Sequence, residues 1–217
     1  MSLGEQWLAF LTGMGACGFI ASYLIGSIPF GLILTKLFGY GDIRTIGSGN
    51  IGATNVLRTG NKWLAASTLF LDGLKGFLAL ELTKHITCQN DLLASFFIFA
   101  NCIAVMLGHI FPVWLKFKGG KGVATAIGAL LAIAPLIATG IGALWLAIFL
   151  LFRISSLSAL SAFCIMTIAS FVLDAFGLSI FALMPVCVLT ITGILLLTHR
   201  QNISRLIKGE EHVWRKK

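Results

Sequence analysis

Six long apolar runs separated by short polar stretches dominate the sequence. A helix that crosses a membrane needs about 20 mostly apolar residues, because the hydrocarbon layer is about 30 Å thick and each residue adds about 1.5 Å. Most of the runs are close to this length, while one is too long for a single helix and too short for two ordinary ones. In chain order the runs cover residues 13–38, 63–83, 92–115, 123–152, 157–173 and 177–198.

The run 123–152 contains 30 uncharged residues and decides the predicted topology. Pro135 lacks a backbone donor, and Gly140 and Gly142 tolerate a tight reversal, so we expect two short helices that break between residues 135 and 142. Cytoplasmic loops carry an excess of Lys and Arg. With this break, 14 of the 16 cations fall on one side, whereas a single helix would place Arg153 and the basic tail opposite the other basic loops.

The pattern therefore predicts an all-α polytopic membrane protein with seven transmembrane helices, as a single domain over residues 1–217. The N-terminus is expected outside and the C-terminus in the cytoplasm. Of the two remaining cations, Lys84 is expected outside and Lys75 within a span. The fourteen cations on the cytoplasmic side are Lys36, Arg44, Arg58, Lys62, Lys116, Lys118, Lys121, Arg153, Arg200, Arg205, Lys208, Arg215, Lys216 and Lys217.

Composition excludes the main soluble classes. Hydrophobic residues make up 58% of the chain and charged residues only 11%, against about 25% in an ordinary soluble domain. The mean hydropathy is +0.96, so a soluble fold would expose mostly hydrocarbon. The five cysteines are scattered without CxxC spacing, which predicts neither a disulfide framework nor a metal site. A soluble enzyme, a disordered tail and a secreted disulfide scaffold are thus excluded.

The first polar stretch, residues 42–58, combines three glycines with hydrogen-bonding side chains between Arg44 and Arg58. Glycine-rich backbone can turn its amides toward an anion, and the arginine fork suits phosphate. The alternative is a flexible polar linker, which does not need two asparagines and an arginine. The candidate residues are Gly47, Ser48, Gly49, Asn50, Gly52, Thr54, Asn55 and Arg58.

The second polar stretch, residues 108–125, carries Lys-Gly-Gly-Lys-Gly at 118–122 just before a predicted helix. Free N–H groups at a helix N-terminus, together with Lys121, favour a bound anion. The sequence is not a Walker A loop, because Gly122 stands where that motif has Ser or Thr. The alternative is an ordinary basic loop that only sets orientation. His109 is expected to be structural.

The third polar stretch, residues 198–211, places His199 three positions before Asn202, so the two share a face if the last helix continues. The helix C-terminus would favour protonated His199. The alternative is a basic helix against anionic lipid. Within the spans, Asp72 and Lys75 are expected to form a structural pair, since intramembrane charges usually face the bundle interior.

A cluster of serines after Arg153 is expected to cap a helix, with Ser156 or Ser158 as a secondary site candidate. Together, the three stretches indicate a cytoplasm-facing pocket that binds phosphorylated substrates beside an apolar compartment. A phosphate-ester transporter and a non-enzymatic lipid-binding protein are the other function classes. A transporter would show inverted repeats, which the sequence lacks, and a lipid-binding protein would not need these Asn, Ser and His residues.

Three motifs resemble the bacterial acyl-phosphate-dependent glycerol-3-phosphate acyltransferases. The similarity runs through almost the whole chain in the same order. The first motif is Gly-Ser-Ile-Pro-Phe-Gly at 26–31 and then Gly-Ser-Gly-Asn-Ile-Gly-Ala-Thr-Asn-Val at 47–56 with Arg58. The second is Gly108-His109, Pro112 and Phe-Lys-Gly-Gly-Lys-Gly-Val-Ala-Thr at 117–125. The third is His-Arg-Gln-Asn-Ile-Ser-Arg-Leu at 199–206 with Gly209 and Glu211.

The resemblance implies seven transmembrane helices in the bacterial inner membrane, with the site facing the cytoplasm. It implies transfer of an acyl group from acyl phosphate to the C1 hydroxyl of sn-glycerol 3-phosphate, giving lysophosphatidic acid and inorganic phosphate. This is the first acylation of phospholipid synthesis. Acyl phosphate, glycerol 3-phosphate, the bilayer and the acyl-phosphate-forming enzyme are the implied partners. No nucleic acid, cofactor or metal is implied.

The implied site residues fall on the three motifs. Those expected to be catalytic are Ser48, Arg58, Lys121, His199 and Asn202. Those expected to bind substrate are Asn50, Thr54, Asn55, Gly119, Gly120, Gly122, Thr125, Ser158 and Glu211. Glu210 is an alternative to Glu211, although the spacing from Asn202 favours Glu211.

The donor is an activated anhydride, so the enzyme mainly positions groups and neutralises charge. We favour direct transfer, with the substrate's phosphate taking the proton and His199 orienting. The alternatives are His199 as general base and Ser48 as an acylated nucleophile. The sequence has no His-x4-Asp pair, the signature of another glycerolipid acyltransferase class.

Overall fold

The computed structural model describes residues 4, 14–86, 92–179 and 181–214, and every regular element in this part of the chain is an α-helix or a 3-10 turn. The predicted Arg215, Lys216 and Lys217 of the basic tail lie outside the described residues, as does Cys88. Contacts divide the chain into two compact units, Met1–Ile133 and Ala134–Lys217. The single domain expected from the sequence stays a prediction.

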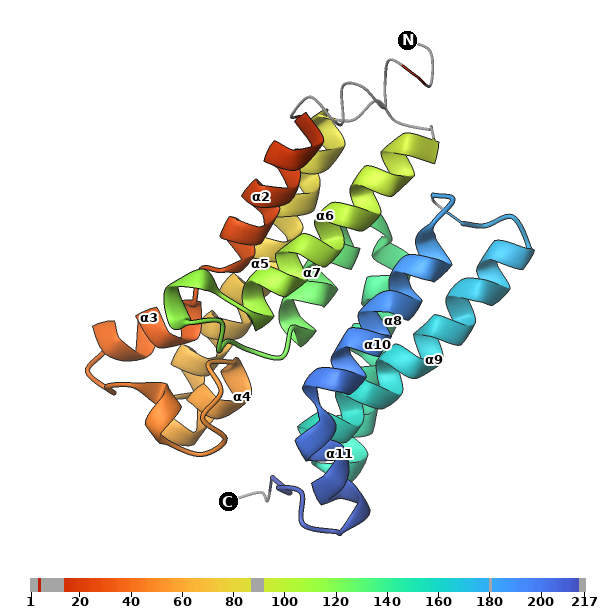
Figure 1. Cartoon of the computed structure of the whole chain (residues 1–217). Helices are drawn as coiled ribbons and strands as arrows, with labels where there is room; N and C mark the ends of the chain where they lie inside the picture. The colour runs from red at the N-terminus through yellow and green to blue at the C-terminus, as the bar shows by residue number, and fades with distance from the viewer. Residues whose placement is uncertain (1–3, 5–13, 87–91, 180, 215–217) are drawn as a thin grey trace. The chain divides into compact units, whose positions relative to one another are not determined.

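The first unit packs four apolar helices side by side, α2, α5, α6 and α7 (Figure 1). Two shorter helices, α3 and α4, and the 3-10 turns η1 and η2 lie at the end of the unit where α5 begins. The loop between α6 and α7 lies at the same end and contains η3. The bounds are Met14–Gly26 for α2, Phe30–Leu37 for α3, Ile43–Thr45 for η1, Ala53–Val56 for α4, Leu57–Thr59 for η2, Lys62–Ile86 for α5, Leu92–Ile110 for α6, Val113–Leu115 for η3 and Val123–Ile133 for α7.

Glycines allow the backbones of the first unit to approach closely, as small residues commonly do between membrane helices. A Cβ on Gly76 of α5 would overlap the carbonyl of Thr125 in α7, and a Cβ on Gly128 of α7 would overlap the carbonyl of Gly73 in α5. Gly108 of α6 meets the backbone of α2 in the same way. These contacts fix where α7 begins, and therefore where the preceding glycine-rich loop ends.

The long uncharged run is two helices, as the sequence predicts. α7 ends at Ile133 and α8 begins at Pro135, so the break falls at Ala134. Gly140 and Gly142 take no part in the break but lie within α8, and Gly140 packs against Met166. With 11 residues, α7 is about 16 Å long and too short to cross a membrane alone.

The second unit contains three long apolar helices and a short amphipathic one: α8 (Pro135–Phe152), α9 (Ser155–Ala175), α10 (Met184–Thr198) and α11 (Arg200–Ile207). α9 packs against both α8 and α10. Arg153 joins α8 to α9 in a left-handed conformation, φ 58°. α10 and α11 meet at His199 with a bend of 67°. The condition under which His199 and Asn202 would share one helix face, a last helix that continues past His199, is therefore not met.

Membrane crossing is supported by helix length and composition. Among the described residues, five candidate spans are long and apolar enough, or six if the bent α10–α11 pair is one span. Adding the shorter α7 would give the seven expected, although the count of seven and the orientation of the termini stay predictions. Many large apolar side chains point outward, including Leu151 and Leu197, as expected of surfaces in contact with lipid.

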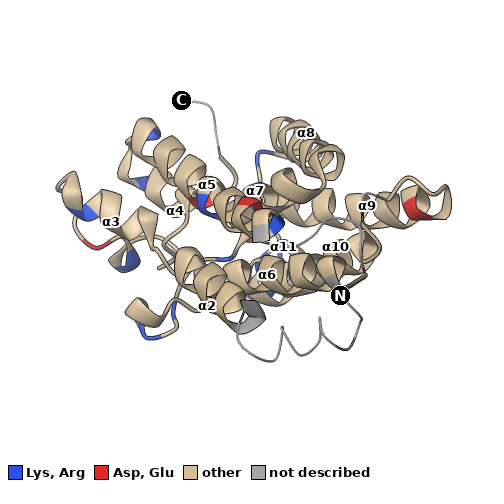
Figure 2. Cartoon of the chain, turned by 90° about the horizontal axis from the view of Figure 1, so that it is seen from above, with Lys and Arg blue, Asp and Glu red and all other residues tan. Residues whose placement is uncertain are grey.

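Most of the charged residues in the described part of the chain lie near the ends of helices or in loops, with the pair Asp72 and Lys75 in the middle of α5 as an exception. Most of the ribbon in Figure 2 is free of charge, and basic residues mark the segments around α3 and α4. In the first unit, Arg44, Arg58 and Lys121 lie at the end where α5 and α7 begin, whereas Lys84 lies near the end of α5. In the second unit, Arg153 and Arg205 share one end, because Trp214 N–H donates to the Arg153 carbonyl at 2.9 Å.

Candidate active site

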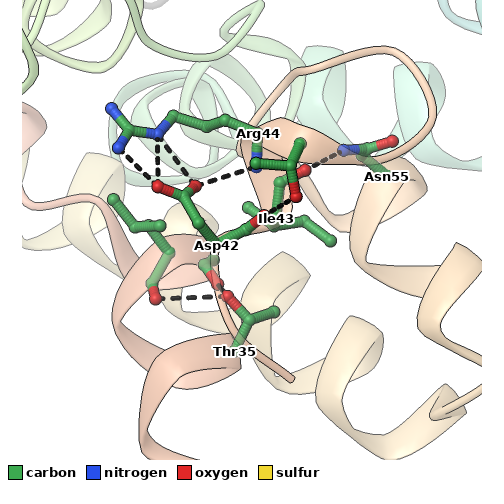
Figure 3. A network of polar contacts seen from close by, with 8 residues as sticks. Thr35, Asp42, Ile43, Arg44 and Asn55 are labelled. Atoms are coloured by element: carbon green, nitrogen blue, oxygen red, sulfur yellow. Dashed lines mark hydrogen bonds and ion pairs between the residues drawn. The ribbon is translucent and has the colours of Figure 1, made fainter. Parts of the chain in front are cut away.

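The buried side chain of Asn55 organises the first glycine-rich loop. Its Nδ2 lies 2.9 Å from the Ile43 carbonyl, 3.1 Å from the Ile46 carbonyl and 2.8 Å from the Asn50 carbonyl, so two N–H groups serve three acceptors. Its Oδ1 accepts from the backbone N–H of Ser48 at 3.0 Å. Figure 3 shows the amide of Asn55 directed at the loop backbone. Both ends of the amide are therefore used to hold the loop, which leaves substrate contact by Asn55 a prediction without geometric support.

The two arginines that flank this loop differ in their partners. Arg44 forms a bidentate pair with Asp42, with Nε–Oδ1 at 2.9 Å and Nη2–Oδ2 at 2.5 Å (Figure 3). The Arg44 guanidinium lowers the pKa of Asp42 from 3.8 to about 2. Arg58 is exposed, and its side chain lies against Gly47, where a Cβ would overlap it. Arg44 already has its counter-charge, so Arg58 stays the stronger candidate for a phosphate contact.

The loop glycines have different roles. Gly47 and Gly49 have positive φ, 57° and 68°, which favours glycine at both positions. Gly52 differs, because it precedes α4 in an extended conformation with φ −77°. Two of the three glycines in this stretch, rather than all three, therefore have the positive φ that turns the backbone. Between them Ser48 is exposed at the tip of the loop, and Thr54 is exposed on α4.

Asn50 joins the first loop to the second. Its Oδ1 accepts from the N–H of Gly52 at 3.0 Å, and its Nδ2 donates to the carbonyl of Gly119 at 3.4 Å. The two glycine-rich stretches, which lie 69 residues apart at this contact, are thus neighbours in the first unit. The sequence suggested one pocket with two cradles, and the contact brings both cradles to one place.

The second loop folds back onto the end of α6. Gly119 N–H donates to the Ile110 carbonyl at 3.0 Å, and Gly120 N–H donates to the His109 carbonyl at 2.9 Å. The expectation that these two amides face an anion is therefore not met, because they already have acceptors. Neither position has room for a side chain. A Cβ at 119 would overlap the His109 carbonyl, and a Cβ at 120 would overlap the His109 ring.

The loop ends at a helix N-terminus, as expected. Gly122 has φ 94° and is followed by α7, whose early N–H groups have no acceptor within the helix. Lys121 immediately precedes Gly122 and is partly exposed. Thr125, in the first turn of α7, is fully buried, and its hydroxyl has no hydrogen-bond partner in the described structure. The features of this loop that would suit an anion are thus Lys121 and the start of α7.

A network of buried polar side chains lies beside this loop. Asp72 and Lys75 of α5 form the ion pair expected from the sequence, with Nζ–Oδ1 at 2.7 Å. Two further acceptors surround Nζ: the Ile28 carbonyl at 2.8 Å and Nδ1 of His109 at 3.0 Å. Sequence reasoning missed the third member, because His109 is 34 positions from Lys75 and no local pattern links them.

In the second unit, His199 occupies the bend between α10 and α11 and is 3% exposed. Its Nδ1 lies 2.8 Å from the Leu195 carbonyl. A carbonyl can only accept, so Nδ1 carries the proton in this contact. The bend turns α11 so that Asn202, also buried, contacts the chain beyond that helix.

Glu211 gathers three side chains of the second unit. Its Oε1 accepts from Asn202 Nδ2 at 2.6 Å and from Ser156 Oγ at 2.9 Å, and its Oε2 accepts from Arg205 Nε at 2.7 Å. Partial burial raises the pKa of Glu211, but the hydrogen bonds from Asn202, Arg205 and Ser156 outweigh it, so the net pKa is below its ordinary value of 4.5. The spacing argument for Glu211 over Glu210 agrees with this geometry.

The serines after Arg153 behave differently from expectation. Ser158, the expected substrate-binding residue, is fully buried, and its hydroxyl donates to the Ile154 carbonyl of its own helix at 2.7 Å. Ser156 is the serine that reaches the third motif. Neither caps α9, because the N-cap residue is Ile154 and it makes no side-chain cap.

No group of three or more His, Cys, Asp and Glu side chains within the described ranges is arranged to hold a metal ion. The polar groups gathered at the two loops are instead cations, amides and hydroxyls. Such groups bind and orient oxyanions. The arrangement is suited to holding phosphate next to apolar helices.

Comparison with known proteins gives a consistent answer. The family model described as glycerol-3-phosphate acyltransferase matches residues 16–209. A glycerol-3-phosphate acyltransferase of Sinorhizobium fredii is 53% identical over 189 residues, covering 87% of each chain. One from Caulobacter vibrioides is 50% identical over 192 residues, covering 88% of this chain and 84% of the relative.

A solved structure is also similar. It is the crystal structure of PlsY (YgiH), an integral membrane glycerol 3-phosphate acyltransferase, in its glycerol 3-phosphate form. It matches with a TM-score of 0.82 and 36% identity, over 94% of this chain and 96% of that chain. Its lysophosphatidic acid form matches with a TM-score of 0.80. The chain therefore belongs to the glycerol-3-phosphate acyltransferase family and is an integral membrane acyltransferase of phospholipid synthesis.

Proposed function

We propose that this protein transfers a fatty acyl group from acyl phosphate to the C1 hydroxyl of sn-glycerol 3-phosphate. The products are lysophosphatidic acid and inorganic phosphate. The observation that carries the proposal is the contact between two glycine-rich basic loops, made by Asn50 and Gly119 at 3.4 Å, which brings together the motifs containing Arg58 and Lys121. A solved relative in glycerol 3-phosphate and lysophosphatidic acid forms supports the same acceptor and product here.

The chemistry is a direct transfer. The C1 oxygen attacks the acyl carbonyl, a new carbon–oxygen bond forms, and the bond from the carbonyl carbon to the phosphate oxygen breaks. The hydroxyl proton passes to a phosphate oxygen of the substrate. In the first unit, Arg58 and Lys121 neutralise phosphate charge and Ser48 orients a reacting group by a hydrogen bond. In the second unit, the motif implies the same orienting role for Asn202.

The surroundings of Ser48 support direct transfer over an acylated enzyme. A serine nucleophile needs a base within hydrogen-bond reach. Within the described part of the first unit, Ser48 Oγ has no hydrogen bond to an imidazole or carboxylate, and Ser48 is linked to Asn55 through its backbone N–H. A hydroxylamine-sensitive acyl group trapped on Ser48 in the absence of glycerol 3-phosphate would contradict direct transfer.

His199 orients a reacting group by a hydrogen bond, and the contact of its Nδ1 with the Leu195 carbonyl fixes the direction of the ring. Asn202 is held in place by Glu211, which also binds Arg205. A carboxylate with three donors is poorly suited to contact a phosphate directly. We therefore infer that Glu211 positions Asn202 rather than binding substrate.

The protein is expected to reside in a bacterial inner membrane, with seven spans, the N-terminus outside and both motif-bearing loops in the cytoplasm. The concentration of cations at one end of each unit supports this orientation. An enzyme that supplies acyl phosphate is the expected partner. Charged thiol reagents test the orientation: a cysteine at Lys118 should react from the cytoplasmic side and one at Lys84 from the outside.

The decisive experiment uses the purified protein with palmitoyl phosphate and glycerol 3-phosphate, monitored for phosphate release and for lysophosphatidic acid. Release that requires both substrates, with product in equal amount, is the expected result. Palmitoyl-CoA in place of palmitoyl phosphate should give no product. Product formed from palmitoyl-CoA alone, or exchange of glycerol 3-phosphate across vesicles without acylation, would refute the proposal.

A further inference from the structure

The transfer mechanism leaves three buried polar side chains of the first unit without a role. Asp72, Lys75 and His109 are 2%, 3% and 4% exposed. They come from the middle of α5 and the end of α6. Buried ionisable groups inside a membrane protein are costly, and they usually mark a functional region.

The ammonium group of Lys75 fixes the protonation of His109. Nζ has three N–H groups and no lone pair, so it can only donate. Its three near acceptors are Asp72 Oδ1 at 2.7 Å, the Ile28 carbonyl at 2.8 Å and His109 Nδ1 at 3.0 Å. His109 Nδ1 must therefore accept, which requires a neutral ring whose proton is on Nε2.

That Nε2–H group lies against the glycine-rich loop. A Cβ at Gly120 would coincide with the ring nitrogen, so the absence of a side chain at 120 makes room for it. Gly120 N–H binds the carbonyl of His109, which holds loop and ring together. No hydrogen bond of Nε2 is seen within the described chain, and the two side-chain contacts of His109, with Lys75 Nζ at 3.0 Å and with Asp72 Oδ1 at 3.6 Å, both run through Nδ1.

An N–H group that no protein acceptor satisfies can donate to water or to a bound ligand. The adjacent loop carries Lys121 and leads into the N-terminus of α7, so the ligand that this region favours is an oxyanion. Thr125, in the first turn of α7, presents a buried hydroxyl without a hydrogen-bond partner in the described structure.

Resting on the proposed function, we propose that His109 is a further substrate-binding residue, whose Nε2–H donates a hydrogen bond to a phosphate oxygen held at the loop 118–122. Asp72 and Lys75 are positioning residues that keep the imidazole in the one tautomer able to donate there. Because the Nε2–H donor carries no charge, its role is to orient the phosphate oxygen, whereas Lys121 and Arg58 supply the positive charge.

The tautomer is tested directly by nitrogen NMR of the full-length protein labelled with 15N-histidine in micelles. His109 is assigned by the signal lost in His109→Asn. We expect an unprotonated Nδ1 and a protonated Nε2 from pH 5.5 to 8.5, and a shift of the Nε2 signal on addition of inorganic phosphate. A protonated Nδ1, or an Nε2 signal that ignores phosphate, would overturn the proposal whether or not the protein has acyltransferase activity.

Two variants of His109 then test the roles of its two ring nitrogens by enzyme kinetics. His109→Asn retains an acceptor for Lys75 but loses the distal donor, so KM for one of the two phosphate substrates should rise about 10- to 100-fold with little change in kcat. His109→Gln places an amide near the position of Nε2 and should recover part of that loss. His85→Asn, at an exposed histidine near the end of α5, is the matched control and should be unchanged.

Wild-type KM in folded His109→Asn would refute the substrate contact. If neither variant folds, the labelled wild-type protein still decides the question through the phosphate titration. A wild-type protein that shows the expected tautomer and phosphate shift, yet no turnover, would refute the proposed reaction and leave the anion site intact.

Discussion

Replacing Asn55 by alanine should loosen the first glycine-rich loop without touching a phosphate ligand. The side chain supplies two N–H donors and one acceptor to the loop backbone, at distances of 2.8 to 3.1 Å. At about 1 kcal/mol for each hydrogen bond, the change shifts the balance between ordered and open loop by about 2–3 kcal/mol. That corresponds to roughly a 30- to 150-fold change in the equilibrium.

Asn55→Asp is the sharper variant, since it keeps the acceptor for Ser48 N–H but turns a carboxylate oxygen toward three carbonyls. We expect both variants to lower the thermal unfolding midpoint and to raise KM for glycerol 3-phosphate in the phosphate-release assay, the aspartate more strongly. Thr45→Val, which removes one exposed bond to the Asp42 carbonyl in the same loop, is the control. Raised KM with an unchanged unfolding midpoint would refute the reasoning, because it would make Asn55 a direct substrate contact.

Three further predictions concern other parts of the molecule. Because the folded-state pKa of Glu211 is below 4.5, its ionised form stabilises the C-terminal segment above that pH, and this stabilisation is lost as pH falls through the lower folded-state value. Glu211→Gln should remove this loosening of the C-terminal segment at acid pH, which the fluorescence of Trp214 monitors. An acid transition that is the same in the variant and the wild type would contradict this prediction. His199→Ala should lose most turnover with the fold retained, measured by phosphate release and unfolding; near-normal turnover would remove His199 from the site. Lys84→Met should destabilise the end of α7 by about 1–2 kcal/mol, because Lys84 Nζ donates to the Ala132 carbonyl at 2.9 Å, with KM unchanged; an unaltered unfolding midpoint would show that this contact contributes nothing.

The helical content and the break in the long apolar run could be predicted from the sequence, because both depend on local features. Apolar length indicates a span, and Pro135 favours a helix start. Gly140 and Gly142 could not be assigned in this way. A glycine in a helix serves close packing as often as reversal, and only the contact with Met166 distinguishes the two at Gly140.

The site was predicted less completely, since its contacts join distant positions. The glycines at 119 and 120 look like an anion cradle in isolation, yet their amides bind the end of α6 and their size accommodates His109. Ser156 and Ser158 are equivalent by sequence, and only the fold of the C-terminal segment directs Ser156 to Glu211. Hydrogen bonds across 47 positions, such as that from Lys75 to Ile28, leave no periodic trace.

The close contact of α5 and α7 through Gly73, Gly76 and Gly128 has a consequence for how the protein responds to its lipid surroundings. Where backbones touch, no flexible side chains remain to rearrange when the bilayer thickens, cools or changes its acyl composition. The start of α7 and the loop before it are then held in place by the rigid contact between the two backbones rather than by packing against the surrounding lipid. We expect the affinity for phosphate at this loop to be nearly independent of membrane fluidity, even where turnover of the acyl substrate varies with it.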